Sequence, residues 1–355
     1  MPEKSTAPPA LRWNSRLWAI GGMMVLLAIV VVFAASVGSA HIPFLTTWKI
    51  LLSKLPLVNI DETWSDNARI IILDTRLPRV VLAGLVGASL SISGATYQGL
   101  FRNPLADPYL IGVSQGAFLG AVIGMLLPSD WQGISNFETV PLLAFAGALF
   151  AVAVVYSLAR TGKSLPVTTL ILAGVALGAF LGSITWYLMI ISDDKLHGII
   201  FWMLGRFSLS NWDQVLSVLP FMLIGTLVIG LHARPLNVMQ LDEEQAQQLG
   251  INVERVKLIL LVSATLITAA AVSFCGTIGF VGIIVPHAVR LVWGPDHRFL
   301  LPLSALVGAI FLILADTLAR TIVVPTEVPI GIITAFFGAP FFLYLLRQKK
   351  RGTFF

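Results

Sequence analysis

One uncharged stretch, residues 80–101, constrains the fold of this chain more than any other segment. It lies between the basic sequence Arg76-Leu-Pro-Arg79 and Arg102, and it contains no acidic or basic residue. An α-helix rises about 1.5 Å per residue and the hydrocarbon core of a bilayer is about 30 Å thick, so roughly twenty such residues cross it. Small residues let membrane helices approach closely, and this stretch is rich in them, so we expect it to pack inside a helix bundle. These residues are Gly84, Gly87, Ala88, Ser89, Ser91, Ser93, Gly94 and Ala95.

The composition of the whole chain agrees with a membrane protein. Hydrophobic residues make up 57% of the 355 residues and charged residues 12%, whereas a soluble domain carries about 25% charged residues. The net charge of +5 does not indicate nucleic-acid binding, because most basic residues lie in loops and tails, as membrane orientation requires. A single cysteine, Cys275, excludes an intrachain disulfide. The segment from Leu17 to Val37 is too long for the apolar core of a signal peptide and is predicted to be an uncleaved first span.

The pattern predicts an all-α integral membrane protein with about ten transmembrane helices in one domain, 17–347. An N-terminal tail, 1–16, and a C-terminal tail, 348–355, flank this domain. A short amphipathic helix is expected at the membrane interface over residues 44–55. The predicted spans are 17–37, 80–100, 110–127, 140–158, 165–191, 215–231, 257–275, 277–292, 301–319 and 328–346.

The segment between Lys257 and Arg290 holds no charged residue and could contain one tilted span or two short ones. The basic run 347–351 and the loop 234–257 are both expected in the cytoplasm, which requires an even number of crossings between them. Gly276, Gly279 and Gly282 can provide the turn, so we predict two spans.

Spans two to five and seven to ten would then run in opposite directions, as in the inverted repeats of many transporters. One weak sequence parallel supports such a repeat. Gly94 precedes Pro104 by ten residues, and Gly276 precedes Pro286 by the same ten.

Several multi-residue motifs resemble the permease family of bacterial ABC importers for ferric siderophores, haem and cobalamin. They include 76–79, 94–99, the run Asn103-Pro104-Leu105-Ala106-Asp107-Pro108, 112–116, 172–178, 276–282, 285–287, 294–298 and 315–320. The resemblance implies a type II importer permease with an inverted four-span repeat in the bacterial inner membrane, both termini cytoplasmic. It also implies a second permease copy, a substrate-binding protein and a separate ATP-binding subunit as partners. No cofactor, metal site or catalytic residue is implied. A ferric siderophore is the first choice of substrate, with haem or cobalamin as alternatives.

Three arginines, Arg76, Arg79 and Arg320, are expected at the outer ends of spans, where the positive-inside rule disfavours them. They could bind lipid phosphates or cap neighbouring helices. Asp316 lies four residues before Arg320 and can pair with it along the helix. In the resembled family, arginines at these motif positions receive acidic residues of the binding protein, so we expect these four residues to form a docking site.

The loop 234–257 is the longest hydrophilic interruption between spans. Asp242 can cap a short helix, Gln245 completes a spacing like that of a capping box, and Gly250 can end the helix in a left-handed conformation. This segment could be an ordinary solvated connector. The resemblance implies the coupling helix that docks on the ATPase subunit, and the expected coupling residues are Leu241, Asp242, Glu243, Glu244, Gln245, Ala246, Leu249 and Gly250.

The fifth and tenth spans are rich in glycine, and in the resembled family they line the pathway between two subunits. Val167 and Thr168 match the position of the cytoplasmic gate of that family. They could equally do no more than begin a helix after Pro166.

Other functional classes fit the sequence less well. An ion-coupled secondary transporter usually holds ionisable residues near the membrane midplane, whereas Asp316 is the only acid well inside a predicted span and lies near its outer end. The run Thr161-Gly-Lys-Ser164 lacks the first glycine of a phosphate-binding loop, because Ser157 occupies that position. No arrangement of nucleophile and base, or of metal-ligating histidines, suggests an enzyme.

Overall fold

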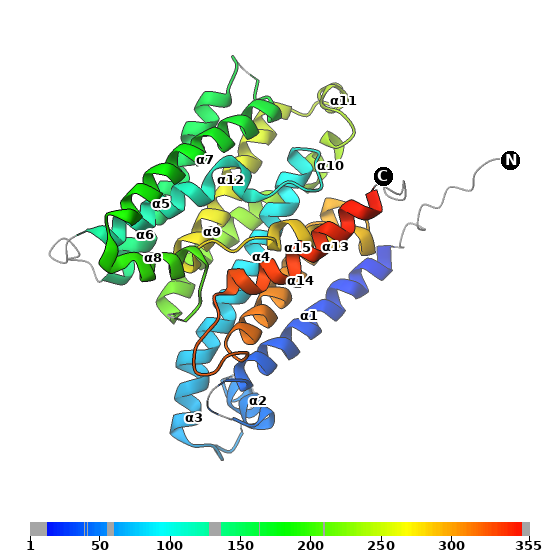
Figure 1. The fold of residues 1–355 in the computed structure, drawn as a ribbon. Helices are drawn as coiled ribbons and strands as arrows, with labels where there is room; N and C mark the ends of the chain where they lie inside the picture. Colours follow the sequence, from blue (N-terminus) through cyan, green and yellow to red (C-terminus); the bar gives the residue numbers. More distant parts are fainter. Residues whose placement is uncertain are drawn as a thin grey trace.

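The computed structural model describes residues 13–38, 40, 42–54, 60–127, 136–162, 164–208 and 210–349. Apart from one isolated bridge between Thr161 and Ser164, the regular structure in this part of the chain is helical (Figure 1). The helices are α1 (Trp13–Ser36), α2 (Phe44–Leu52), α3 (Asp66–Ile70), α4 (Leu77–Leu100), α5 (Val113–Leu126), α6 (Asn136–Ala159), α7 (Val167–Ile190), α8 (Leu196–Met203), α9 (Trp212–Leu231), α10 (Ala233–Met239), α11 (Glu243–Gln248), α12 (Val253–Cys275), α13 (Val281–Trp293), α14 (His297–Ala319) and α15 (Ile330–Lys349). A π-helical segment, η1 (Ile71–Arg76), and two short 3-10 helices, η2 (Pro108–Ile111) and η4 (Asp193–Lys195), complete them.

Helices occupy the positions of all ten predicted spans. Seven apolar helical segments of the described chain are long enough to cross a membrane, and α5, α13 and α15 are shorter apolar helices. The amphipathic helix expected over 44–55 is present as α2. Most of the N-terminal tail and the end of the basic run 347–351 lie outside the described residues.

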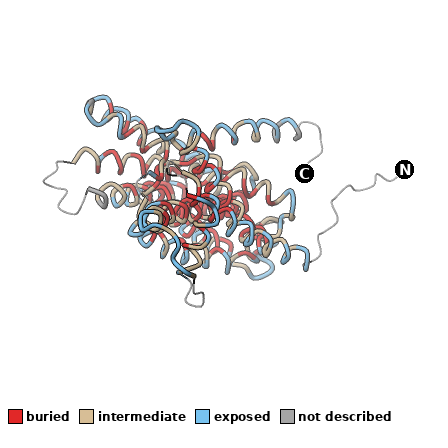
Figure 2. The backbone as a smooth tube through the Cα atoms, turned by 90° about the horizontal axis from the view of Figure 1, so that it is seen from below, coloured by how far each residue is buried: buried red, intermediate tan, exposed pale blue. Residues whose placement is uncertain are grey.

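The predicted interior position of the small-residue helix is confirmed. Within its apolar window, 83% of the residues of the segment Asp66–Leu100 are buried, against 17% for α1. Helix α4 packs on α9, α12, α13 and α14. The buried residues of the chain gather in the middle of the bundle (Figure 2). A Cβ on Gly94 would lie 1.8 Å from the carbonyl oxygen of Gly282, so the backbones of α4 and α13 are in direct contact.

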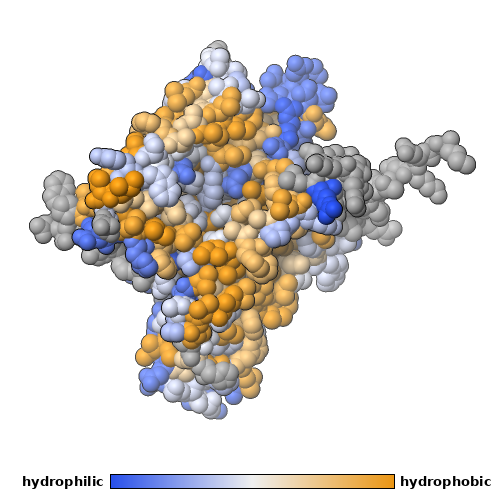
Figure 3. Space-filling view, viewed as in Figure 1, coloured by the Kyte–Doolittle hydropathy of each residue, from blue (hydrophilic) through white to orange (hydrophobic). Residues whose placement is uncertain are grey.

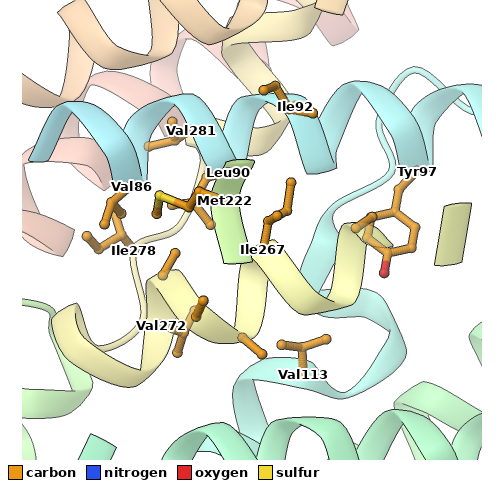
Figure 4. Packing of buried hydrophobic residues seen from close by; sticks show 14 of the residues in the cluster. Val86, Leu90, Ile92, Tyr97, Val113, Met222, Ile267, Val272, Ile278 and Val281 are labelled. Carbon is orange, nitrogen blue, oxygen red and sulfur yellow. The ribbon is translucent and has the colours of Figure 1, made fainter. Parts of the chain in front are cut away.

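The helical structure is interrupted between α12 and α13, as the glycines in this region predict. We call this interruption the break. Gly276 has φ +74° and ends α12, and a Cβ there would lie 1.9 Å from the carbonyl oxygen of Trp202. The hydroxyl of Tyr109 donates to the carbonyl of Ile278 (3.1 Å) and accepts from its N–H (3.2 Å), which satisfies the backbone of the break. Beside it, Ile278 and Val281 join the apolar core around α4 (Figure 4).

The packing of the helices has an internal symmetry. Helix α4 packs on α14 and α13, and α12 packs on α6 and α5. Within each group, α5 packs on α6 and α7, and α13 packs on α14 and α15. Each helix of the group α4–α7 therefore has a counterpart in the group α12–α15 with equivalent neighbours. This is the packing expected of a four-span repeat.

Two features were not predicted from the sequence. Helices α3 and η1 extend the second span at its N-terminal end, and α8 forms within the segment 192–214 between the fifth and sixth spans. Both lie at the end of the bundle opposite α10 and α11 (Figure 1). The face of the bundle seen in Figure 3 carries broad apolar areas. Helix α7 contributes exposed Leu172, Phe180 and Tyr187. Apolar surface of this extent fits contact with lipid or with another membrane subunit.

Candidate functional sites at the two ends of the bundle

At the end of the bundle that carries α2 and α3, Arg79 joins two acidic residues. Its guanidinium donates to both carboxylate oxygens of Asp316 and, at 2.7 Å, to Glu327. The Asp316 side chain is 2% exposed, that of Arg79 12% and that of Glu327 40%, so the cluster runs from the protein interior to the surface. A forked guanidinium–carboxylate contact is one of the stronger polar interactions available to side chains. Asp316 thus has Arg79 of α4 as its main partner, 237 residues away in sequence.

The other two arginines serve the fold of the described chain. Arg76 is buried, and its guanidinium donates to the carbonyl oxygens of Ala35 (3.0 Å), Ser36 (2.8 Å) and Ala40 (2.5 Å). Arg320 bonds to the carbonyl of Ala34.

The last carbonyls of an α-helix lack intrahelical donors, so these two arginines cap the end of α1. The expected pair between Arg320 and Asp316 is present, but at 3.7 Å it is the weaker contact of that carboxylate. Of the three arginines expected to form a docking site, Arg76 and Arg320 thus bond to the end of α1, and Arg79 bonds to Asp316 and Glu327. Their docking role stays a prediction. Arg76 and Arg320 have the alternative role considered from the sequence, because they cap the end of a neighbouring helix.

At the opposite end, α11 has the boundaries expected of a short, fixed helix. The Asp242 side chain accepts a hydrogen bond from the N–H of Glu243 (2.7 Å), and Gly250 has φ +83° just past the helix end. The N–H of Ile251 closes this end on the carbonyl of Ala246 (3.0 Å). The predicted cap and stop are confirmed, whereas Gln245 makes no reciprocal bond to Asp242 among the hydrogen bonds of the described residues.

The structure of α11 differs from the sequence expectation at Ala246, which lies on the buried face of the helix. Ala246 is 0% exposed, so it does not belong to the docking surface and packs inward instead. Its small side chain allows this short helix to lie against α10 and α12. Leu241 and Leu249 flank the helix and are 71% and 69% exposed. These two leucines give the α11 region exposed apolar side chains, and Glu244 on the helix is exposed as well. The surface around α11, at the upper right of Figure 3, is otherwise mostly hydrophilic.

A buried lysine behind α11 was missed from the sequence. Lys257 of α12 is 3% exposed, and its ammonium group lies 2.7 Å from Glu243 and 3.1 Å from Glu254. The spacing of three residues between Glu254 and Lys257 was a signal for this ion pair. Glu243, one of the expected coupling residues, is thus bound to Lys257 and keeps a side chain that is 27% exposed.

The proposed gate residues begin α7. Val167 is the first residue of this helix after Pro166, and Thr168 beside it is exposed. The chain before them is fixed to α12, because the N–H of Leu165 donates to the carboxylate of Glu254 (2.8 Å).

The motif residues of the loop after α4 shape its turns. Asn103 accepts a hydrogen bond from the N–H of Leu105 (3.0 Å), and Asp107 accepts from the N–H of Tyr109 (2.7 Å), which starts η2. Pro108 is buried and packs beside Gly282 at the start of α13. Pro104, between the two turns, is half-buried. The motif therefore connects the loop after α4 with the break before α13.

A second loop at this end, before α14, is attached to α10. The side-chain amide of Asn237 donates to Asp296 (2.7 Å), and the carbonyl oxygen of the same amide contacts Nδ1 of His297 (2.7 Å). The hydrogen bond from Arg298 lowers the pKa of Asp296 to about 2, so this carboxylate is ionised at neutral pH. These contacts fix α10, and through it the start of α11, against the bundle.

A model of the FecCD transport family matches residues 26–348 of the chain. The chain belongs to this family. It is 45% identical to the uncharacterized ABC transporter permease protein YvrB of Bacillus subtilis, over 92% of each chain. It is 50% identical to the cobalamin import system permease protein BtuC of Halobacterium salinarum, over 80% of this chain and 75% of that one. A solved structure described as an inward-facing conformation of a metal-chelate type ABC transporter matches with a TM-score of 0.80 and 30% identity, covering 93% of this chain and 98% of that one.

As a FecCD-family member with several apolar helices, the chain is a multi-pass membrane permease of an ABC importer. It is a transport component, and ATP hydrolysis belongs to a separate subunit. The resemblance noted in the sequence is thereby confirmed, and the rival interpretation as an ion-coupled secondary transporter is set aside.

Proposed function

We propose that this FecCD-family permease moves a metal chelate into the cytoplasm when an ATPase subunit docks on α11. The observation that carries the proposal is the construction of α11: a capped start, a left-handed stop at Gly250, and two exposed leucines on a helix fixed to the bundle. A ferric siderophore is the chelate favoured from the sequence. Cobalamin is the chelate to test beside it, because the Halobacterium relative carries that name.

The proposed assembly contains two copies of the chain. Helices α7 and α15 both present large exposed apolar side chains, among them Phe180 of α7 and Phe336 of α15. A second copy covering these faces would enclose a pathway between the subunits, with Val167 and Thr168 as its gate. The binding protein would dock at the other end, where Arg79 and Glu327 reach the surface while Arg76, Arg320 and Asp316 support them from below.

Replacing Leu241 and Leu249 together by aspartate is expected to weaken ATPase binding by at least about tenfold, because burying one leucine contributes roughly 1.5–3 kcal/mol. Co-purification of the permease with its ATPase at graded concentrations measures the effect. Gln248→Asp is the matched control, since it adds a charge at an exposed position of α11 without removing apolar surface. Equal ATPase binding by the double variant and the wild type would reject α11 as the docking element.

The proposed orientation places the α11 end and both termini in the cytoplasm. Reporter fusions at Asn252 and after Arg351 should therefore give cytoplasmic signals, and a fusion after Ile322 should give a periplasmic signal. An exterior signal from the C-terminal fusion would require an odd number of crossings after α11 and would contradict the ten-span topology.

A further inference from the structure

Two elements to which the proposed function gives separate tasks meet at one buried side chain. Helix α11 would receive the ATPase, and the start of α7 would form the gate. Between them lies Lys257 of α12, whose side chain is 4% exposed. A buried ammonium is tolerated only when it is paired, so its contacts are obligatory for this conformation.

The contacts form a continuous chain from α11 to α7. Glu243 in the first turn of α11 binds the Lys257 ammonium at 2.7 Å, and the same ammonium binds Glu254 at 3.1 Å. The second oxygen of Glu254 accepts the N–H of Leu165 at 2.8 Å, two residues before α7 begins. The carbonyl of Leu165 lies 3.4 Å from the Lys257 ammonium.

These contacts differ from the other charged contacts of α11. Arg102, at the end of α4, lies 3.6 Å from both Asp242 and Glu243 and is 43% exposed. Exposed pairs at such distances contribute little to stability. The Lys257 pairs are shorter and their ammonium group is buried, so a displacement of α11 changes their energy more steeply.

We propose that Lys257 is a positioning residue that transmits displacement of α11 to the start of α7. This inference rests on the proposed function, because it takes α11 as the docking element and α7 as the gate helix. When α11 moves, Glu243 pulls the Lys257 ammonium with it. Glu254 then either moves with the ammonium and pulls Leu165 along, or loses its hydrogen bond to the N–H of Leu165. Without the lysine, Glu243 and Glu254 would face each other as like charges, and α11 could shift without moving the residues before Val167.

The test compares the amount of substrate transported per ATP hydrolysed in purified complexes of the permease with its ATPase and binding protein. Only complexes that co-purify are measured, so a loss of ATPase binding does not enter the ratio. We expect Lys257→Met and Glu243→Gln each to lower the ratio by about tenfold or more. The variant that combines Lys257→Met with Glu243→Gln should have the same ratio as Lys257→Met alone, because both changes interrupt the same link. Lys257→Arg, which keeps the charge, should keep most of the wild-type ratio.

Arg255→Gln is the control. It removes a positive charge two residues earlier on α12 from an exposed side chain, and it should leave the ratio unchanged. An unchanged ratio in Lys257→Met would overturn the proposed relay from α11 through Lys257 to α7. If Lys257→Met does not assemble with the ATPase, an unchanged ratio in Glu243→Gln has the same meaning. Either result leaves the proposed function intact. Failure of Lys257→Arg to keep most of the ratio would also overturn the relay in favour of a packing role. Transport by the wild-type chain without any ATPase would instead refute the proposed function, and the relay with it.

Discussion

Replacing Arg79 by methionine should destabilise the permease by about 3–5 kcal/mol, because it leaves a buried carboxylate without its main partner. Asp316 is 2% exposed and receives three hydrogen bonds from Arg79. After the substitution, the ion pair left to this carboxylate among the described residues is the one with Arg320, at 3.7 Å. Thermal unfolding of the purified protein in one detergent measures the loss.

The double variant Arg79→Met with Asp316→Asn provides the internal control. Removing both charges abolishes the unpaired carboxylate, so the double variant should be more stable than Arg79→Met alone. A loss below about 1 kcal/mol in the single variant would show that the pair is solvated and contributes as little as a surface ion pair. The same series matters for the proposed binding-protein site, because a charge reversal at Arg79 can weaken docking merely by disturbing the fold.

Gly94→Val should prevent the chain from folding stably, the largest effect we expect from one substitution. The added Cβ would lie 1.8 Å from the carbonyl oxygen of Gly282, which is backbone and cannot move aside as a side chain can. Overpacking within a core costs about 1–3 kcal/mol where side chains can adjust, and more where they cannot. The yield of monodisperse protein after detergent extraction is the measurement.

Gly22→Val on α1 is the matched control for this experiment. Nothing lies within 4 Å of a Cβ at that position, so the variant should be recovered at the wild-type yield. Recovery of Gly94→Val at that same yield would mean that α4 and α13 are not in backbone contact in the membrane.

Most of the fold could be predicted because its signals are local. The length of an apolar segment, the small residues of α4 and the glycines around Gly276 each act within one stretch of chain. The cap at Asp242 and the stop at Gly250 are likewise set by neighbours a few residues away. Such features follow from the sequence without knowledge of the tertiary structure.

The contacts of the candidate sites depend on tertiary structure, and there the sequence was insufficient. The partner of Asp316 is 237 residues distant, so the local spacing to Arg320 suggested a weaker pair instead. Ala246 faces inward because α11 lies against the bundle, and a helix of six residues has too few positions to reveal its buried face. Arg76 is withdrawn from the surface by the carbonyls at the end of α1, which the positive-inside rule does not consider.

The glycine contacts of α4 also limit how the permease can change shape. Gly87 and Gly94 lie directly against the backbones of α14 and α13, at Gly308 and Gly282, with no side chain between them. A contact of this kind cannot adjust through new rotamers; it can only persist or separate as a whole. These three helices should therefore act as a stationary frame during the transport cycle. Alternation between the two sides of the membrane is then left to helices that pivot against this frame.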